Sequence, residues 1–284
     1  MLPPIIAIRS WPRNSRLRWC GANCTAVLGL LGFLVGELPA QSAPPGYTAR
    51  ILDGAVFSER VRSQVRTQAG FGSREESVGR NAEWRLVVDS VGPPLWITAW
   101  YDSLALWRSG PEGRITPDPD GIIGGWFKGV ITESGIVTLK VLPFVPAEIA
   151  EVSDLSTAFA TLLPRLPGRA LPVGGTWQDS TGLRIFRRPD SLAGSRRLER
   201  YRWDQERTDT TYQTESDSLT FTVMTDAQES GELVWDSEWG PVAWKRSTAT
   251  EITIPAAGSV LRPARSRVVE EVVVSRRLSP GGSG

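Results

Sequence analysis

The sequence predicts a mainly β (α+β) fold: a strongly curved antiparallel sheet, or half-barrel, whose two strand-rich halves wrap around one central helix. Hydrophobic and polar residues alternate in several segments, for example residues 61–67 and 242–254, and this period of two is typical of half-buried strands. Beyond the N-terminus, only residues 153–163 show the period of an amphipathic helix. A lone helix between two strand-rich halves has to bury its apolar face against a sheet.

The first strand-rich half is expected to cover residues 47–141. After the strand at 61–67, residues 83–91 and 95–101 form two strands separated by Gly92, Pro93 and Pro94, because glycine and proline interrupt regular structure. Residues 122–132 and 136–141 have the pattern of a hairpin that turns at residues 133–135.

The second half is expected to cover residues 176–278. Its clearest strands are residues 219–223 and 242–254, and a closing strand is expected at 267–277. Residues 232–236 join the 242–254 strand through a turn that contains Gly240 and Pro241. Residues 279–284 are expected to form a flexible tail.

The central helix is expected at residues 153–163, within a joining segment at 147–175. Its apolar positions fall at i, i+4, i+7 and i+8, namely Leu155, Phe159, Leu162 and Leu163. Ser153 is the expected N-cap, and Asp154 places a negative charge in the first turn, where the helix dipole favours it. Pro164 ends the helix, because proline lacks an N–H and disfavours helical geometry in the residue before it.

The same region carries a resemblance to a known family. Residues 153–177 read SDLSTAFATLLPRLPGRALPVGGTW, and the helix followed by LPRLP and VGGTW resembles an uncharacterised family of exported bacterial β-rich proteins with an "lP…vGdtW" linker. This chain departs from that pattern at Gly175, where the family has an acidic residue. The architecture resembles the LolA/LolB lipoprotein carriers, so the resemblance implies a half-barrel sheet around helices and an apolar cavity.

Residues 1–40 have the features of a cleavable export signal. Four arginines precede an apolar run at residues 26–36, and Ala40 supplies a small residue before the expected cleavage point. The apolar run is shorter than the ~20 residues that span a bilayer. We therefore expect a periplasmic or secreted bacterial protein with one domain at residues 44–278, whose halves at 47–141 and 176–278 are joined by 147–175.

The composition excludes several kinds of catalytic site. The chain of 284 residues has no histidine, which removes Ser-His-Asp and Cys-His nucleophile systems and imidazole metal sites. Cys20 and Cys24, its 2 cysteines, both precede the expected cleavage point. A formal net charge of +1 gives no reason to expect a nucleic-acid partner. We expect no cofactor and no metal.

Two acidic motifs resemble functional sites but have simpler explanations. Residues 118–121 (DPDG) resemble the start of a calcium loop, but the later oxygen ligands are missing, so a turn is expected. Glu270 and Glu271 are neighbours in a predicted strand, where they would point to opposite faces and cannot act together.

An arginine-rich stretch runs from Arg184 to Arg207, with eight arginines against four acids. Because side chains alternate along a strand, the simpler interpretation is that these arginines lie on a solvated face. The functional interpretation is that they contact anionic lipid headgroups or envelope polymer.

Aromatic and small residues in the predicted strands give the candidate ligand-lining set: Trp84, Trp126, Gly129, Phe159, Trp203, Phe221 and Trp244. These residues either line an apolar space or fill the core between sheet and helix. The expected function is non-catalytic binding or carriage of an apolar or lipid-like ligand in the cell envelope. The alternatives are a structural or protein-interaction module with a filled core, and an enzyme with dispersed carboxylates. The sequence does not indicate an oligomeric state.

Overall fold

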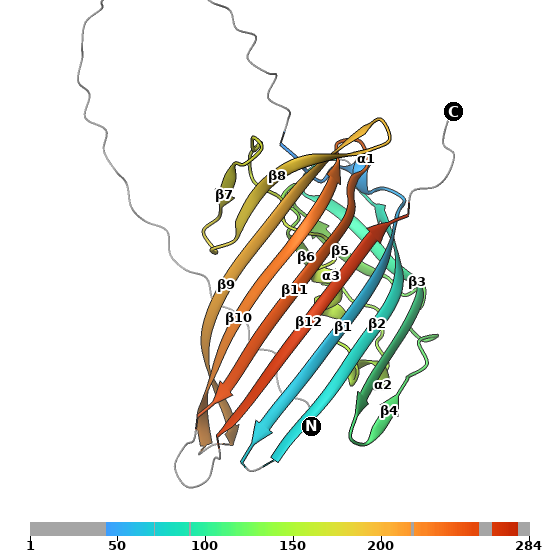
Figure 1. Cartoon of the computed structure of the whole chain (residues 1–284). Coiled ribbons are helices and arrows are strands. Elements are labelled where there is room, and N and C mark those ends of the chain that lie inside the picture. Colours follow the sequence, from blue (N-terminus) through green and yellow to red (C-terminus); the bar gives the residue numbers. More distant parts are fainter. Residues whose placement is uncertain (1–43, 71, 91, 217–218, 256–262, 278–284) are drawn as a thin grey trace, which may run out of the picture. The chain divides into compact units, whose positions relative to one another are not determined.

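One large antiparallel sheet of 12 strands, open and curved, dominates the fold (Figure 1). The computed structural model describes residues 44–70, 72–90, 92–216, 219–255 and 263–277, except for the side chains of residues 213–221. Among these residues no helix is long and apolar enough to cross a membrane. The mainly β class and the curved antiparallel sheet predicted from the sequence are confirmed.

The strands of the first half are β1 (Ala55–Ala69), β2 (Gly72–Val88), β3 (Leu95–Gly110), β4 (Gly113–Ile115), β5 (Phe127–Ile131) and β6 (Val137–Val141). Those of the second half are β7 (Thr176–Gln178), β8 (Arg184–Ala193), β9 (Arg196–Ser216), β10 (Leu219–Asp236), β11 (Gly240–Ile254) and β12 (Ala264–Arg276). Three short helices accompany them: α1 (Ala49–Leu52), α2 (Ala147–Ala150) and α3 (Leu155–Ala160). The expected strand at 122–132 is correct only for its second part, because the chain makes a turn before β5 begins.

The two halves of the sheet meet where the first long strand pairs with the last. The strand order is β6-β5-β3-β2-β1-β12-β11-β10-β9-β8-β7, with β4 beside β3. Between β1 and β12 the antiparallel register runs from Phe57 opposite Arg276 to Ala69 opposite Ala264. Each half is a meander of neighbouring strands, so the sheet has free edges at β6 and β7.

The expected central helix is wrong as an organising element. In place of an eleven-residue helix at 153–163, the structure has a single short helix, α3, and the rest of residues 142–175 is irregular apart from α2. The N-cap is Asp154 and not Ser153, since the Asp154 carboxylate accepts hydrogen bonds from the backbone N–H groups of Ser156 (2.9 Å) and Thr157 (3.3 Å). The helix ends at Ala160, four residues before Pro164, and Thr161 is its C-cap.

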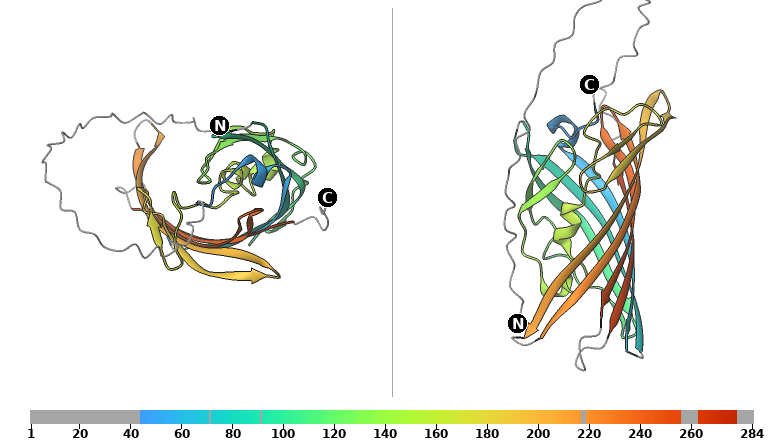
Figure 2. Two further views of the ribbon diagram at one scale, coloured as in Figure 1. Left: turned by 90° about the horizontal axis from the view of Figure 1, so that it is seen from above. Right: turned by 90° about the vertical axis from the view of Figure 1, so that its left-hand side faces the viewer.

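The side chains of this joining segment are nevertheless buried. Leu155, Phe159, Leu162 and Leu163 are all at most 4% exposed, although the last two lie beyond the helix. Figure 2 shows the sheet curving around the yellow-green segment that contains α2 and α3. We call residues 142–175 the linker segment. It covers part of the concave face of the sheet and supplies the second layer of the core.

The turn between β5 and β6 fixes one end of the linker segment. Gly135 has a φ of +87°, and a Cβ there would lie 2.6 Å from the Pro164 carbonyl oxygen, so only glycine fits this close approach. The Tyr47 hydroxyl donates to the same carbonyl at 2.8 Å, and the Leu166 N–H donates to the Ser134 carbonyl at 2.9 Å. The hairpin turn expected at residues 133–135 is therefore confirmed and contacts the linker segment.

Candidate functional site

The concave face of the sheet is identified by the alternation of buried residues along the long strands. In β1 the buried positions are odd-numbered up to Ser63, and Phe57 and Val61 among them belong to the core. The register places Val61 beside Val272, and Phe57 contacts Trp244 edge-on with ring centroids 5.4 Å apart. Because side chains alternate across a strand, every residue of the same parity faces the same side.

The part of the concave face under the linker segment is filled by aromatic rings. Phe159 of α3 stacks on Phe127 with centroids 5.5 Å apart, and Trp84 lies 3.8 Å from Tyr101 and 5.4 Å from Phe127. All four side chains are fully buried. Gly129 of β5 lets this cluster close, because a Cβ there would come within 3.0 Å of the Phe159 ring. The covered part of the concave face is a packed core.

A buried ion pair joins this core to the linker segment. Arg80 of β2 donates to both carboxylate oxygens of Glu59, at 2.9 and 3.2 Å, and to the Ser153 hydroxyl at 3.0 Å. The Trp84 indole N–H donates to the same carboxylate at 2.9 Å. Burial alone would lower the pKa of Arg80, but the adjacent Glu59 carboxylate outweighs burial and raises it. The charge of Arg80 is thus fixed, and its role is structural.

Beyond the linker segment, the long strands continue, and none of the described residues forms a second layer over their concave face. In β11 the alternation of buried and exposed residues stops after Lys245, and residues 246–254 are half-buried on both faces. Two rows of concave-face residues cross four strands here, and we call them the open floor: Val65, Val268, Thr250 and Ala227 in one row, and Thr67, Ser266, Ile252 and Thr225 in the next. All eight are half-buried and none is charged.

The convex-face row that lies between these two rows is charged, whereas the next convex row (Gln64, Val269, Ala249 and Gln228) is uncharged. Between the two rows of the open floor, the register aligns Arg66, Arg267, Glu251 and Asp226 on the other side of the sheet. Each of these four side chains is charged. The uncharged, methyl-rich open floor is therefore the candidate binding surface.

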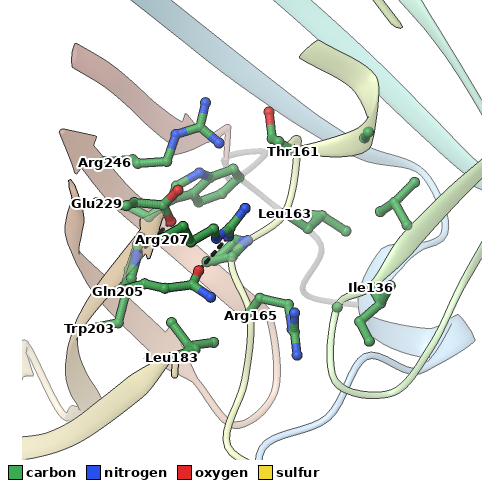
Figure 3. A pocket seen from close by; sticks show the side chains of 15 residues that line it. Ile136, Thr161, Leu163, Arg165, Leu183, Trp203, Gln205, Arg207, Glu229 and Arg246 are labelled. Atoms are coloured by element: carbon green, nitrogen blue, oxygen red, sulfur yellow. Dashed lines mark hydrogen bonds between the residues drawn. The ribbon is translucent and has the colours of Figure 1, made fainter. Parts of the chain in front are cut away.

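A cavity of about 170 Å³ lies between strands β9, β10 and β11 and the linker segment (Figure 3). Its apolar lining includes Trp203 of β9 and Trp244 of β11, which are both 4% exposed. The Trp203 ring lies over Gly231 of β10, where a Cβ would come within 2.1 Å of it. The Trp203 indole N–H donates to Glu229 at 3.0 Å, which places this carboxylate at the cavity.

Three arginines from separate segments line the same cavity: Arg165 of the linker segment, Arg207 of β9 and Arg246 of β11. Arg165 is paired with Asp179 at 2.9 Å, and Arg246 is paired with Glu270 at 3.2 Å. Hydrogen bonds from Thr181 and Leu183 hold Asp179 in place. Burial raises the pKa of Asp179, but these hydrogen bonds together with Arg165 outweigh it and lower that pKa below its ordinary value.

The residues predicted to line a ligand site occupy three different environments. Trp203 and Trp244 line the cavity. Trp84, Gly129 and Phe159 lie in the packed aromatic core. Trp126 lies just before β5 and is 60% exposed, with the Lys128 ammonium 5.0 Å from its ring centroid. The side chain of Phe221 lies outside the described residues.

The arginine-rich stretch that runs from Arg184 to Arg207 forms most of β8 and the first part of β9. Its arginines do not share one face. Arg187 is buried against Asp190 and Glu199, and Arg184 pairs with Asp204 on the convex side. Arg188 and Arg200 lie directly opposite each other in the register and are both exposed.

Neither the arginines at the cavity nor the open floor is predicted from the sequence. Arg165, Arg207 and Arg246 are far apart along the chain, and only the sheet register and the position of the linker segment bring them together. The sequence of β11 does contain one indication of the open floor. Its alternate residues Thr248, Thr250, Ile252 and Ile254 are all uncharged, and this run is longer than a strand needs to cover a buried core. Among the described residues, no group of three or more His, Cys, Asp or Glu is placed to hold a metal ion.

Neither a protein-family model nor a curated protein sequence matches this chain. One matching solved structure concerns lipid–protein interactions in lipovitellin, with 7% sequence identity and a TM-score of 0.41. That match covers 82% of this chain and 26% of the lipovitellin chain, so this chain spans about a quarter of it. A likeness this distant identifies neither a family nor a ligand. The described residues define an open curved-sheet protein whose concave face includes the uncharged open floor.

Proposed function

We propose that this protein is exported to the cell envelope and there binds or carries an apolar, lipid-like ligand on the open floor, without catalysing a reaction. The observation that supports this proposal is the contrast between the two faces of β1, β10, β11 and β12. The open floor presents uncharged side chains, whereas the row behind it is Arg66, Arg267, Glu251 and Asp226. An uncharged surface with no second layer is suited to an apolar ligand.

The size of the expected effect follows from one-sided burial. Fully burying a methylene group contributes about 0.8 kcal/mol, and an open trough covers roughly half of an acyl chain, so a chain of about 16 carbons gains roughly 6 kcal/mol. This gain corresponds to affinities between millimolar and micromolar. Binding in that range is reversible, as carriage requires.

Export is the second part of the proposal and depends on residues 1–40, which lie outside the described residues. Their arginines followed by an apolar run support a cleavable signal. Intact mass of the exported form should show processing after Ala40 or a few residues later. A mature species that still reacts with a thiol reagent through Cys20 or Cys24 would contradict this.

The binding proposal is tested with a pair of variants in β11. Ile252→Glu places a charge on the open floor, while Thr253→Glu places the same charge on the convex face one residue away. We expect a C16 ligand to raise the melting temperature of the natural protein by roughly 5–10 °C at about 100 times its Kd. Ile252→Glu should weaken binding at least about tenfold, and Thr253→Glu should not change it.

Absence of any acyl-ligand effect on melting temperature or tryptophan emission would refute the carrier function. The packed aromatic core around Trp84 and Phe159 specifically favours the other candidate, an interaction module with a filled core. In that case the free edge strands β6 and β7 are the surfaces to test.

Contact with an anionic envelope surface forms a separate part of the proposal. It is supported by Arg188 and Arg200, which face each other across β8 and β9 with no carboxylate within 4 Å among the described residues. Like charges directly opposite in a sheet destabilise it unless an anion lies nearby. Binding to vesicles with and without anionic lipid should therefore differ, and Arg188→Gln should reduce the difference.

A further inference from the structure

We infer that the cavity beside the open floor binds the oxyanion head group of the ligand, so that the ligand is an anionic amphiphile. This inference depends on the proposed function for its apolar part. It assigns the chemical class of the head group, a carboxylate or phosphate attached to an acyl chain, and the direction in which the ligand lies.

The first observation is a pair of donors that lack acceptors. The Nε atoms of Arg165 and Arg246 are both buried and have no hydrogen-bond partner among the described residues. Both arginines line the cavity, and each also has a terminal nitrogen bonded to a carboxylate, of Asp179 and Glu270 respectively. A buried donor without an acceptor is costly, and both of these donors belong to residues that line the same cavity.

The second observation concerns Arg207. Its guanidinium donates to the side-chain oxygen of Gln205, two residues earlier on the same face of β9. No carboxylate lies within 4 Å of it among the described residues, which distinguishes it from Arg165 and Arg246. A guanidinium has five N–H donors in a planar fork that matches a carboxylate or phosphate, so Arg207 retains donors for an anion.

One acid lines the cavity as well. The Oε1 atom of Glu229 accepts the Trp203 indole N–H at 3.0 Å. Glu229 therefore has a fixed donor of its own and does not supply the acceptor that the Arg165 and Arg246 Nε atoms lack. Two of the three guanidinium groups at the cavity, those of Arg165 and Arg246, are already paired with Asp179 and Glu270, so Arg207 is the one that an entering oxyanion would meet without an ion-pair partner among the described residues.

Along β11 one row separates the cavity from the open floor, where Thr248 lies between Glu229 and Glu270. Arg246 lies at the cavity, and Thr250 and Ile252 on the open floor have the same parity four and six residues further along. Six residues of strand span roughly 20 Å. One leaflet of a bilayer core is about 15 Å thick, so an extended acyl chain with its head group at Arg246 fits on this length of strand. Trp203 and Trp244 provide apolar contact at the junction.

The experiment compares two ligands that share a chain and differ in the head group. Palmitate and palmityl alcohol are titrated into the natural protein, the Arg207→Gln variant and an Arg62→Gln control, with tryptophan emission and melting temperature as readouts. Arg207 is suitable because its replacement leaves no carboxylate unpaired, and Arg62 is an exposed arginine on the convex face of β1. We expect the natural protein to bind palmitate at least tenfold more tightly than the alcohol. Arg207→Gln should remove that preference without weakening alcohol binding, and Arg62→Gln should retain it.

Different results would overturn different conclusions. Equal affinity for the acid and the alcohol, or an equal loss for both in Arg207→Gln, refutes the head-group assignment and leaves the apolar carrier function intact. Failure of both ligands to bind refutes the proposed function itself. A third titration uses inorganic phosphate: if phosphate alone gives the same shift and competes fully with palmitate, the cavity is a free-anion site and the amphiphile assignment is wrong. Replacing palmitate by a lysophospholipid with the same chain distinguishes carboxylate from phosphate.

Discussion

Replacing Phe159 by alanine is the sharpest test of the linker segment as part of the core. Phe159 is 0% exposed, stacks on Phe127 at 5.5 Å and lies 6.3 Å from Trp84. An aromatic side chain that removes about 150 Å² from water contributes roughly 4 kcal/mol, which agrees with the 3–5 kcal/mol that Phe→Ala substitutions in cores typically cost. For a domain of this size the melting temperature should fall by roughly 6–20 °C.

The chain provides its own control in Phe144, which also belongs to the linker segment and is 81% exposed. Phe144→Ala should change the free energy of unfolding by no more than about 0.5 kcal/mol. Urea unfolding followed by tryptophan emission and circular dichroism measures both variants. Equal effects for Phe144→Ala and Phe159→Ala, or a loss under 1 kcal/mol for Phe159→Ala, would show that the linker segment lies on the surface in solution. If Phe159→Ala does not fold, Phe159→Leu should retain most of the stability.

Three further predictions concern other contacts. Arg80→Met leaves the buried Glu59 carboxylate without its ion-pair partner and should cost about 3–5 kcal/mol in thermal unfolding. Gly240→Ala should destabilise by more than about 2 kcal/mol, because φ is +75° and the new Cβ would lie 2.2 Å from Ile51. Partial burial would raise the pKa of Asp154, but hydrogen bonds from its helix outweigh it and lower that pKa, so its contribution is present above about pH 4 and lost as the pH falls further. Asp154→Asn should therefore lose less stability than the natural protein between pH 6 and pH 3.

The Arg80 and Gly240 predictions each have a matched reference. Arg60→Met replaces an exposed arginine on the opposite face of β1 and should be nearly neutral. Gly54→Ala has the same left-handed strain as Gly240→Ala, with a φ of +67°, but no atom within 4 Å of the new Cβ. If the two glycine variants are equally unstable, the steric part of the argument is wrong. If Arg80→Met and Arg60→Met have the same melting temperature, the buried pair does not stabilise the fold.

The strands could be predicted because their signal is local. Alternation at residues 61–67 lies within β1, and the turn around Gly240 joins β10 to β11 as expected. The pairing of β1 with β12 could not be predicted, because nothing in either strand specifies a partner from the opposite end of the chain. The total length of the strands was also underestimated, since β9 and β10 extend into polar sequence where alternation is weak.

The helix prediction was correct about burial and wrong about conformation. Leu155, Phe159, Leu162 and Leu163 are all buried, as their spacing indicates. The α-helix ends early, and the Leu162 N–H bonds to the Phe159 carbonyl at 3.2 Å in a tighter turn. Close packing against the sheet specifies which side chains point inward, and an irregular segment satisfies that requirement as well as a helix does.

The candidate site was only partly accessible from sequence. Trp203 and Trp244 were selected as aromatic residues in strands, and both line the cavity. Trp84 and Phe159 were selected on the same grounds and lie in the packed core, because a sequence does not show which part of a concave face the linker segment covers. The arginines at the cavity are indistinguishable in sequence from those that line the convex face.

The pairing of β1 with β12 has a consequence for biosynthesis. Their contacts join residues roughly two hundred positions apart, so the middle of the sheet forms only after almost the entire chain has been made, and such long-range pairing is slow. Until then each half presents a long unpaired strand. The β1 strand of one molecule can pair with β12 of another during that interval, which would produce domain-swapped dimers at high concentration. Dilute refolding should therefore favour the monomer, and cleavage of the chain within the linker segment should leave two fragments that reassociate through this seam.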